Sequence, residues 1–121
     1  MQITQKNFYK KLLGRAGEKR AVEFLKEKGY KILDTNFKTH IGEIDIIAKD
    51  GLFTVFCEVK TRSSDAFGQP SDAVNHKKQE KYFMVATEYL RNKRLLDCPS
   101  RFDVIEIENG QINHIIDAFS M

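Results

Sequence analysis

The sequence predicts a mixed α/β fold, with one mixed sheet flanked by helices and a β-hairpin at the carboxyl end. A long helical segment comes first, three strand-like segments follow it, and a second helical segment precedes the last two strands. This order favours a mixed sheet covered by helices over a sandwich or a parallel Rossmann sheet. With 121 residues, of which 41% are hydrophobic, we expect residues 1–121 to form a single domain.

The first half of the chain divides into a helix and three strands. Strong helix formers predict a helix from about Phe8 to Lys28, and Gly29 stands where a helix-terminating glycine belongs. Asp50-Gly51 between two apolar runs signals a hairpin. The expected strands are Tyr30–Leu33, Ile41–Ala48 and Leu52–Thr61.

The second half contains a helix and a hairpin. A polar loop over 63–70 leads to a helix from about Ser71 to Asn92, whose apolar residues recur at the spacing of a helix laid on a core. Asn109-Gly110 is a strong signal for a type I′ turn. We therefore expect strands at Phe102–Glu108 and Gln111–Ala118.

Composition excludes several classes of protein. Cys57 and Cys98 form no zinc-ligand spacing, and a free cysteine inside a strand is typical of a reduced, cytosolic protein. The amino terminus lacks a signal-peptide pattern, and no apolar run approaches about 18 residues, so we expect a cytoplasmic protein without membrane contact. Glycine-rich phosphate loops are missing. Structural or solvent-exposed roles are expected for the three histidines, His40, His76 and His114.

Positive charge is concentrated near the amino terminus. Residues 1–38 contain ten Lys or Arg against four Asp or Glu, whereas residues 39–121 contain ten against thirteen. A basic face suits contact with a phosphate backbone, and it is equally typical of a solvated helix. The candidate nucleic-acid contacts are Lys19, Lys26, Lys28 and, on the second helix, Lys78.

Acidic side chains gather on the hairpin around Asp50-Gly51. If that pair is the loop, Asp45 opposes Phe56 with Glu58 on its diagonal, and a shift of two residues puts Asp45 directly opposite Glu58. In either register Asp45, Glu58 and Lys60 share one face. Asp45 and Glu58 could hold Mg²⁺ together with water and a substrate phosphate, while Lys60 orients water or counters charge. A solvated edge hairpin would show the same alternation, so this pattern leaves both interpretations open.

Glu18 is a third candidate acid. On the first helix it lies beside apolar and small residues, where a carboxylate needs a partner. That partner is either a lysine or arginine side chain at the rim of the core, or the metal site formed by Asp45 and Glu58.

Several motifs in order make the chain similar to a known family. From about Gly14 to Phe119 it resembles the YraN-like family of uncharacterised bacterial proteins. That family is similar in turn to archaeal Holliday-junction resolvases and to the PD-(D/E)xK nuclease superfamily. The matching motifs are Gly17-Glu18, Asn36, Gly42–Asp45, Phe56–Arg62, Phe67-Gly68, Lys78-Gln79 and Arg101–Asp103.

The resemblance implies a restriction-endonuclease-like fold with an αβββαβ core, and it implies a role for each matching residue. Asp45 and Glu58 match the acids of the motif, Lys60 its lysine, Glu18 the acid of the first helix and Gln79 a polar residue of the second helix. Ile44 stands in place of the motif's proline, which carries no chemistry.

The function expected from the residues and the resemblance together is a DNA endonuclease that depends on Mg²⁺ or Mn²⁺. Branched DNA is a candidate substrate, and its coordinated cleavage would call for a homodimer. The alternative is a noncatalytic nucleic-acid-binding module with a nuclease-like fold.

Overall fold

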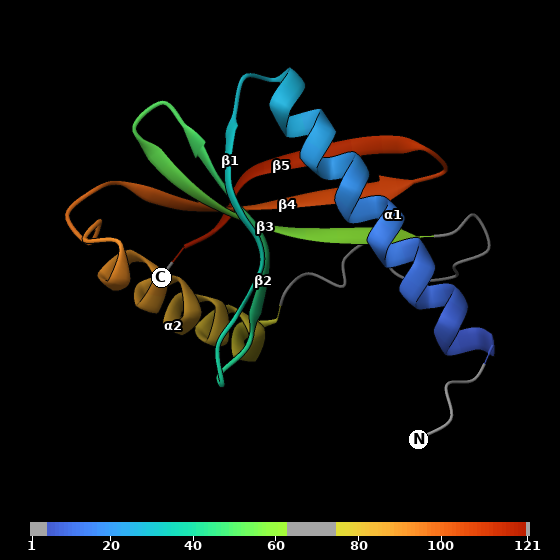
Figure 1. Cartoon of the computed structure of the whole chain (residues 1–121), viewed down its shortest axis with the longest axis horizontal. Coiled ribbons are helices and arrows are strands. Elements are labelled where there is room, and N and C mark those ends of the chain that lie inside the picture. Colours follow the sequence, from blue (N-terminus) through green and yellow to red (C-terminus); the bar gives the residue numbers. More distant parts are fainter. Residues whose placement is uncertain (1–4, 63–74, 121) are drawn as a thin grey trace.

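A computed structural model of the chain describes residues 5–62 and 75–120, with side chains from residue 12 onward. Five strands form one sheet in the order β1-β2-β3-β4-β5, and a helix lies against each face (Figure 1). Only β3 and β4 run parallel, because α2 connects them as a crossover. The mixed sheet with two flanking helices and a terminal hairpin confirms the predicted fold class. The elements are α1 (Gln5–Glu27), β1 (Lys31–Lys38), β2 (Glu43–Asp50), β3 (Phe53–Arg62), α2 (His76–Asn92), β4 (Ser100–Glu108) and β5 (Gln111–Phe119).

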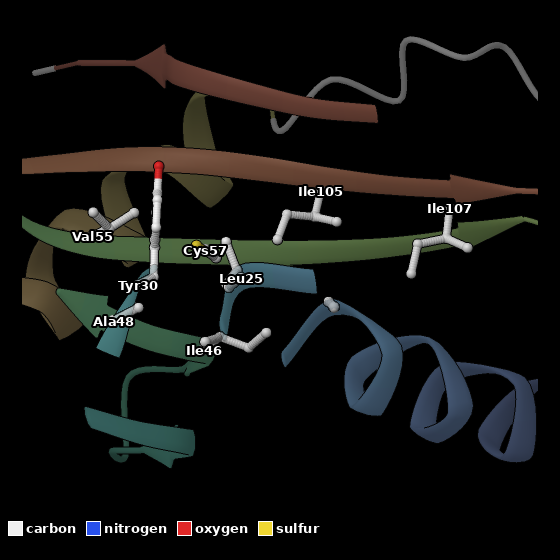
Figure 2. Packing of buried hydrophobic residues seen from close by; sticks show 9 residues of the cluster. Leu25, Tyr30, Ile46, Ala48, Val55, Cys57, Ile105 and Ile107 are labelled. Atoms are coloured by element: carbon white, nitrogen blue, oxygen red, sulfur yellow. The ribbon is translucent and has the colours of Figure 1, made fainter. Parts of the chain in front are cut away.

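Each helix covers its own hydrophobic cluster. On one face, Ala21 and Leu25 of α1 pack against alternate residues of the central strands, several of which are seen in Figure 2. On the other face, Val85 and Tyr89 of α2 pack against Phe56 and its neighbours. Because both faces of the central strand β3 are covered, its residues from Thr54 to Cys57 are all buried. Among them, Cys57 is a buried free cysteine, as the sequence predicted.

Residues with positive φ values end α1 and form the turn between β4 and β5. Gly29 adopts a φ of 92°, a conformation that glycine reaches without strain, and its N–H donates to the carbonyl of Lys26 at 2.9 Å to close α1. Asn109 and Gly110 have φ values of 51° and 79° between the paired residues Glu108 and Gln111. Two successive positive φ values are those of a type I′ turn, so the second predicted hairpin is confirmed.

Some predicted boundaries were wrong. The helix α1 begins at Gln5 rather than Phe8, and β1 extends to Lys38 rather than Leu33. Pairing with β2 over the whole of β1 outweighs the weak strand preference of its polar residues. Asn75 has extended backbone angles and caps α2 by accepting from the N–H of Lys78 at 3.0 Å, so α2 begins at His76. Residues 71–74 lie outside the described residues.

The hairpin between β2 and β3 takes the second of the two predicted registers. Asp50 pairs with Phe53 and Lys49 with Thr54, which leaves Gly51 and Leu52 as the loop. Extending that register puts Asp45 opposite Glu58. The paired stretch nevertheless ends at Ile46 and Cys57, one residue short of the two carboxylates.

A close approach of α1 to β3 brings the helix over the end of this hairpin. A Cβ atom on Gly17 would lie 1.9 Å from Oγ1 and 3.1 Å from Cβ of Thr61. Only a residue without a side chain lets the helix come this near to the strand. The next residue along α1 is Glu18, which is thereby carried to the carboxylates of β2.

A buried polar network joins β4 and β5 to the carboxyl end of α1. Asp103, which is 0% exposed, accepts hydrogen bonds from Nε of Arg101 at 3.0 Å, from a ring nitrogen of His114 at 2.7 Å and from the N–H of Asp117 at 2.9 Å. Arg101 also donates to the hydroxyl of Tyr30 at 2.7 Å, which extends from the α1 cluster toward β4 (Figure 2).

The tautomer of His114 follows from its two neighbours. Its Nδ1 lies 2.8 Å from the ammonium of Lys28, which can only donate, so that nitrogen accepts and Nε2 carries the proton given to Asp103. His114 is therefore structural, as predicted.

Within residues 5–62 and 75–120, neither helix is long and apolar enough to cross a membrane.

Candidate functional site

Asp45 occupies the point where β2 separates from β3. Its Oδ2 accepts the backbone N–H of Val59 at 2.9 Å, just beyond the last paired residues of the two strands. A side chain thus takes the place of a ladder hydrogen bond. This contact fixes one carboxylate oxygen of Asp45, and the side chain also has a hydrogen bond with Glu18.

Several negative charges act on Asp45. Burial is the largest influence, and it raises the pKa of Asp45 to about 7 from 3.8, against the lowering effect of the Val59 hydrogen bond. The charges of Glu18, Glu58 and Glu43 raise the pKa of Asp45 further. The structure therefore brings acids from α1, β2 and β3 within electrostatic reach of one another.

Glu58 is held by α2 on the opposite side of the sheet from α1. Its Oε2 accepts a hydrogen bond from the hydroxyl of Tyr82, and its Oε1 lies 3.7 Å from the ammonium of Lys78. The Glu58 side chain is 12% exposed, so these are its polar partners in a largely enclosed position. Burial, followed by the hydrogen bond to Glu58 and its charge, raises the pKa of Tyr82 far above its usual range, which keeps the phenol protonated.

Glu18 approaches Asp45 from the α1 side. The pKa of Glu18 is raised, mainly by burial and further by the charge of Glu43. Hydrogen bonds with Asn36 and with Asp45 lower the pKa of Glu18 and so offset part of this effect. With its amide nitrogen facing the acids, Asn36 donates to Glu43 at 2.9 Å and to Glu18 at 3.1 Å. Asn36 has a φ of 52°, a left-handed conformation that asparagine tolerates and that places its side chain between the two acids.

An open cleft of about 370 Å³ lies between α1 and strands β1 and β2. Glu18 and Asp45 line it, Arg15 and Lys19 line its α1 wall, and both basic side chains are exposed. Residues four apart on a helix lie about 6 Å from each other, so the two cations form a short row beside the carboxylates.

Lys60 follows Glu58 by two residues on β3 and so projects on the same face of the strand. It is half-buried, and in the described part of the chain it forms no ion pair. Gln79 lies in the first turn of α2, next to Lys78, where its N–H donates to the carbonyl of Asn75 at 2.9 Å.

The remaining predicted nucleic-acid contacts lie away from the acids. Lys26 and Lys28 are eight and ten residues beyond Glu18, which along a helix corresponds to roughly 12–15 Å. Lys28 is also occupied, because it contacts His114 and lies over the rings of Phe24 and Tyr30. The structure thus groups Lys19 and Lys78 with the acids and separates Lys26 and Lys28 from them.

Sequence reasoning missed three side chains at this site as functional residues. Tyr82 lies at the apolar spacing of α2, and nothing in the sequence indicates that its hydroxyl has a partner on β3. Arg15 lies with Lys19 on the wall of the cleft. Its position three residues before Glu18, on the same side of the helix, could have indicated this. Asn36 appeared only within the family motif.

The donor set suits a hard divalent cation. Asp45 accepts the Val59 N–H with one oxygen and also has a hydrogen bond with Glu18, whereas Glu58 has one oxygen held by Tyr82 and the other near the ammonium of Lys78. Within 5–62 and 75–120, no three His, Cys, Asp or Glu side chains are arranged as a metal-binding group. Such a pair of carboxylates matches Mg²⁺, which commonly takes one or two carboxylates and completes its shell with water and phosphate.

Asp45→Asn is expected to remove the contribution of Asp45 to the pH dependence of stability in the metal-free protein between about pH 4 and 7, while that of Glu18, whose pKa is also raised, remains. In the parent, the folded state holds the proton of Asp45 up to about pH 7, whereas the unfolded chain releases it near 3.8. Parental stability therefore falls as the pH rises across this window, by up to roughly 4 kcal/mol. Asparagine keeps an oxygen that accepts the Val59 N–H and carries no charge.

Urea unfolding at pH 5 and pH 8 in EDTA measures this effect. Asp97→Asn, in an exposed loop, is the matched control and should follow the parent. If the parent and Asp45→Asn lost equal stability between pH 5 and pH 8, the raised pKa of Asp45 would not be the cause of the loss in the parent.

Comparisons with known proteins agree on one family. A model described as uncharacterised protein family UPF0102, the YraN-like family, matches residues 17–107. A UPF0102 protein of Thermodesulfovibrio yellowstonii is 52% identical over 107 residues, covering 88% of this chain and 95% of its own length. A UPF0102 protein of Clostridioides difficile is 48% identical over 108 residues, covering 88% of this chain and 95% of its own.

Proposed function

The chain belongs to the uncharacterised protein family UPF0102, and from that premise we propose that it is a metal-dependent endonuclease that hydrolyses phosphodiester bonds in DNA. The burial of Asp45 within electrostatic reach of three further acids is the observation that carries the proposal. A buried carboxylate surrounded by Glu18, Glu58 and Glu43 is unfavourable in the isolated protein, and a divalent cation would relieve the repulsion.

Each residue of the site has a role in this proposal. Asp45 and Glu58 hold Mg²⁺ or Mn²⁺, and Glu18 completes the acidic set from the cleft side. When bound, the cation would neutralise the acids and polarise an oxygen of the scissile phosphate. Lys60, on the same face as Glu58, orients the attacking water or stabilises charge that develops on the phosphate. Gln79, beside Lys78 at the start of α2, contributes a polar contact.

DNA is bound mainly through its phosphates in this proposal. Arg15 and Lys19, which line the cleft beside the acids, and Lys78, which lies near Glu58, would contact the phosphates of the bound strand. Affinity that rests on phosphate contacts falls steeply with salt. Cleavage of branched DNA at paired positions would in addition require two copies of the chain, so the homodimer belongs to the branched-substrate form of the proposal.

A cleavage screen tests the proposal. Purified protein is incubated with a four-way junction, a flapped duplex and a linear duplex, each with Mg²⁺, with Mn²⁺ and with EDTA. We expect cleavage of at least one substrate that requires the cation and is lost in Asp45→Asn but retained in Asp97→Asn. If the parent binds these DNAs and cleaves none of them, the noncatalytic binding module takes the place of the nuclease.

A further inference from the structure

Helix α2 holds both oxygens of Glu58 with two side chains one helical turn apart. Tyr82 donates its hydroxyl proton to Oε2, and the ammonium of Lys78 lies 3.7 Å from Oε1. Residues four apart on a helix share a face, so the same face of α2 contacts both oxygens of the Glu58 carboxylate. The two contacts differ in kind, because one is a directed hydrogen bond and the other a long ion pair.

The Tyr82 contact is built into the core of the α2 face. The ring of Tyr82 stacks on that of Phe119 with centroids 6.1 Å apart and an angle of 25° between the planes. Beside it, Glu58 and Tyr82 line a narrow void of about 10 Å³ together with Phe56, Phe102 and other apolar residues. Since the ring cannot move freely, the hydroxyl is presented to Glu58 from a fixed position.

The Lys78 contact is exchangeable. The Lys78 side chain is 56% exposed, and an ion pair in such a position contributes little to stability because water competes for both charges. A divalent cation that approaches Oε1 therefore has to displace only a flexible ammonium. The Tyr82 hydrogen bond to the other oxygen is unaffected by that exchange.

We propose that Tyr82 is the positioning residue of this site: its hydroxyl fixes Oε2 of Glu58 so that Oε1 is presented to the divalent cation, and Lys78 occupies Oε1 until the cation replaces it. Tyr82 acts through Glu58 and does not touch the substrate. This inference rests on the proposed function only in taking Asp45 and Glu58 as ligands of the cation. Hydrogen bonds that orient a ligating side chain typically change metal affinity by about ten- to a hundredfold.

The proposal predicts opposite effects for two variants of the same helix. Tyr82→Phe keeps the ring and its stacking but loses the hydroxyl, and Mn²⁺ affinity should fall by about tenfold or more. Lys78→Gln removes the competing charge, and Mn²⁺ affinity should rise by about two- to fivefold. The matched controls are Tyr89→Phe, a buried tyrosine seven residues along α2, and Lys77→Gln, an exposed lysine next to Lys78. Both controls should bind Mn²⁺ as the parent does.

Calorimetric titration with Mn²⁺ alone measures these affinities without DNA, and thermal melting in EDTA confirms that each variant is folded. If Tyr82→Phe is folded and binds Mn²⁺ like the parent, or if Tyr89→Phe loses as much affinity, Tyr82 is not a positioning residue. An unchanged or weakened affinity in Lys78→Gln would overturn the exchange at Oε1. A parent that binds no Mn²⁺ overturns both this inference and the proposed function.

The nuclease proposal and this inference can fail separately. If the parent binds Mn²⁺ and Tyr82→Phe weakens that binding, but no DNA is cleaved, the positioning role stands and the nuclease falls. If DNA is cleaved, the rate of Tyr82→Phe should return to near the parental kcat at saturating Mn²⁺, because only cation affinity is impaired. Failure of that recovery would point to a role for Tyr82 in the reaction itself and overturn the positioning role.

Discussion

Lys60→Ala is expected to cleave DNA at least about a hundredfold more slowly than the parent, while it binds Mn²⁺ and DNA with most of the parental affinity. Lys60 projects on the same face of β3 as Glu58, two residues away, yet its ammonium cannot serve as a metal ligand. Removing one preorganised charge or proton-transfer group typically costs about a hundredfold or more in rate. Single-turnover cleavage and calorimetric titration together separate the two effects.

The control for this prediction is Lys49→Ala. Lys49 is exposed and pairs with Thr54 near the loop of the β2–β3 hairpin, so the same net charge is lost away from the acids. Its cleavage rate should stay near that of the parent. A Lys60→Ala variant that cleaves like Lys49→Ala would remove Lys60 from the reaction, and one that only binds DNA less well would favour the noncatalytic module.

Asp103→Ala is expected to lower the free energy of unfolding by about 3–5 kcal/mol, the usual cost of breaking a buried ion pair from one side. Arg101 donates to both carboxylate oxygens of Asp103 at 3.0 and 3.1 Å, and His114 donates from the other side. Their side chains are only 11% and 3% exposed, so water cannot replace the lost acceptor. A loss of this size is a large part of the total stability of a small domain.

The pH dependence of the free energy of unfolding provides a second test of the role of Asp103. Burial alone would raise the pKa of Asp103, but hydrogen bonds from His114, Arg101 and the Asp117 N–H outweigh it and hold the pKa below its usual value. The stabilisation from the ionised carboxylate is therefore present above about pH 4 and is lost as the pH falls through the lowered pKa. The parent should lose this contribution in acid, whereas Asp103→Ala has none to lose.

Urea unfolding at pH 7 and pH 3 measures both effects. Asp97→Ala, at an exposed loop position, should stay within about 0.5 kcal/mol of the parent. A loss below about 1 kcal/mol for Asp103→Ala at pH 7 would show that the network contributes little to folding.

Features that depend on a few neighbouring residues could be predicted from the sequence. The helix end at Gly29 and the Asn109-Gly110 turn follow from backbone conformations that few residue types adopt. The apolar stripe of α2 follows from helical periodicity alone, and its members Val85, Ala86, Tyr89 and Leu90 are buried as expected. Asp45, Glu58 and Lys60 could be identified as candidates because all three lie on the two strands of one short hairpin.

Features that depend on how distant segments pack could not be predicted. A shift of two residues in the β2–β3 hairpin preserves every side-chain direction, so the alternation of residue types allowed both registers. The close approach at Gly17 and Thr61 brings Glu18 to Asp45, and nothing in either segment alone specifies that distance. The contact of Lys28 with His114, 86 residues away, likewise arises only when the chain folds.

The sequence by itself determined the order of helices and strands, the helix end at Gly29, the Asn109-Gly110 turn and the acidic and basic residue types available for a site, because these follow from local backbone preferences and periodicity. Only the tertiary structure decided that Asp45 leaves the strand ladder to accept from Val59, and that Glu58 is held by Tyr82 of α2. It also decided that Asp103 is buried with Arg101 and His114. The physical reason is the same in all three cases. A polar side chain removed from water must find its partner among whatever the packed elements bring within about 3 Å, and that partner is chosen by packing over long sequence separations.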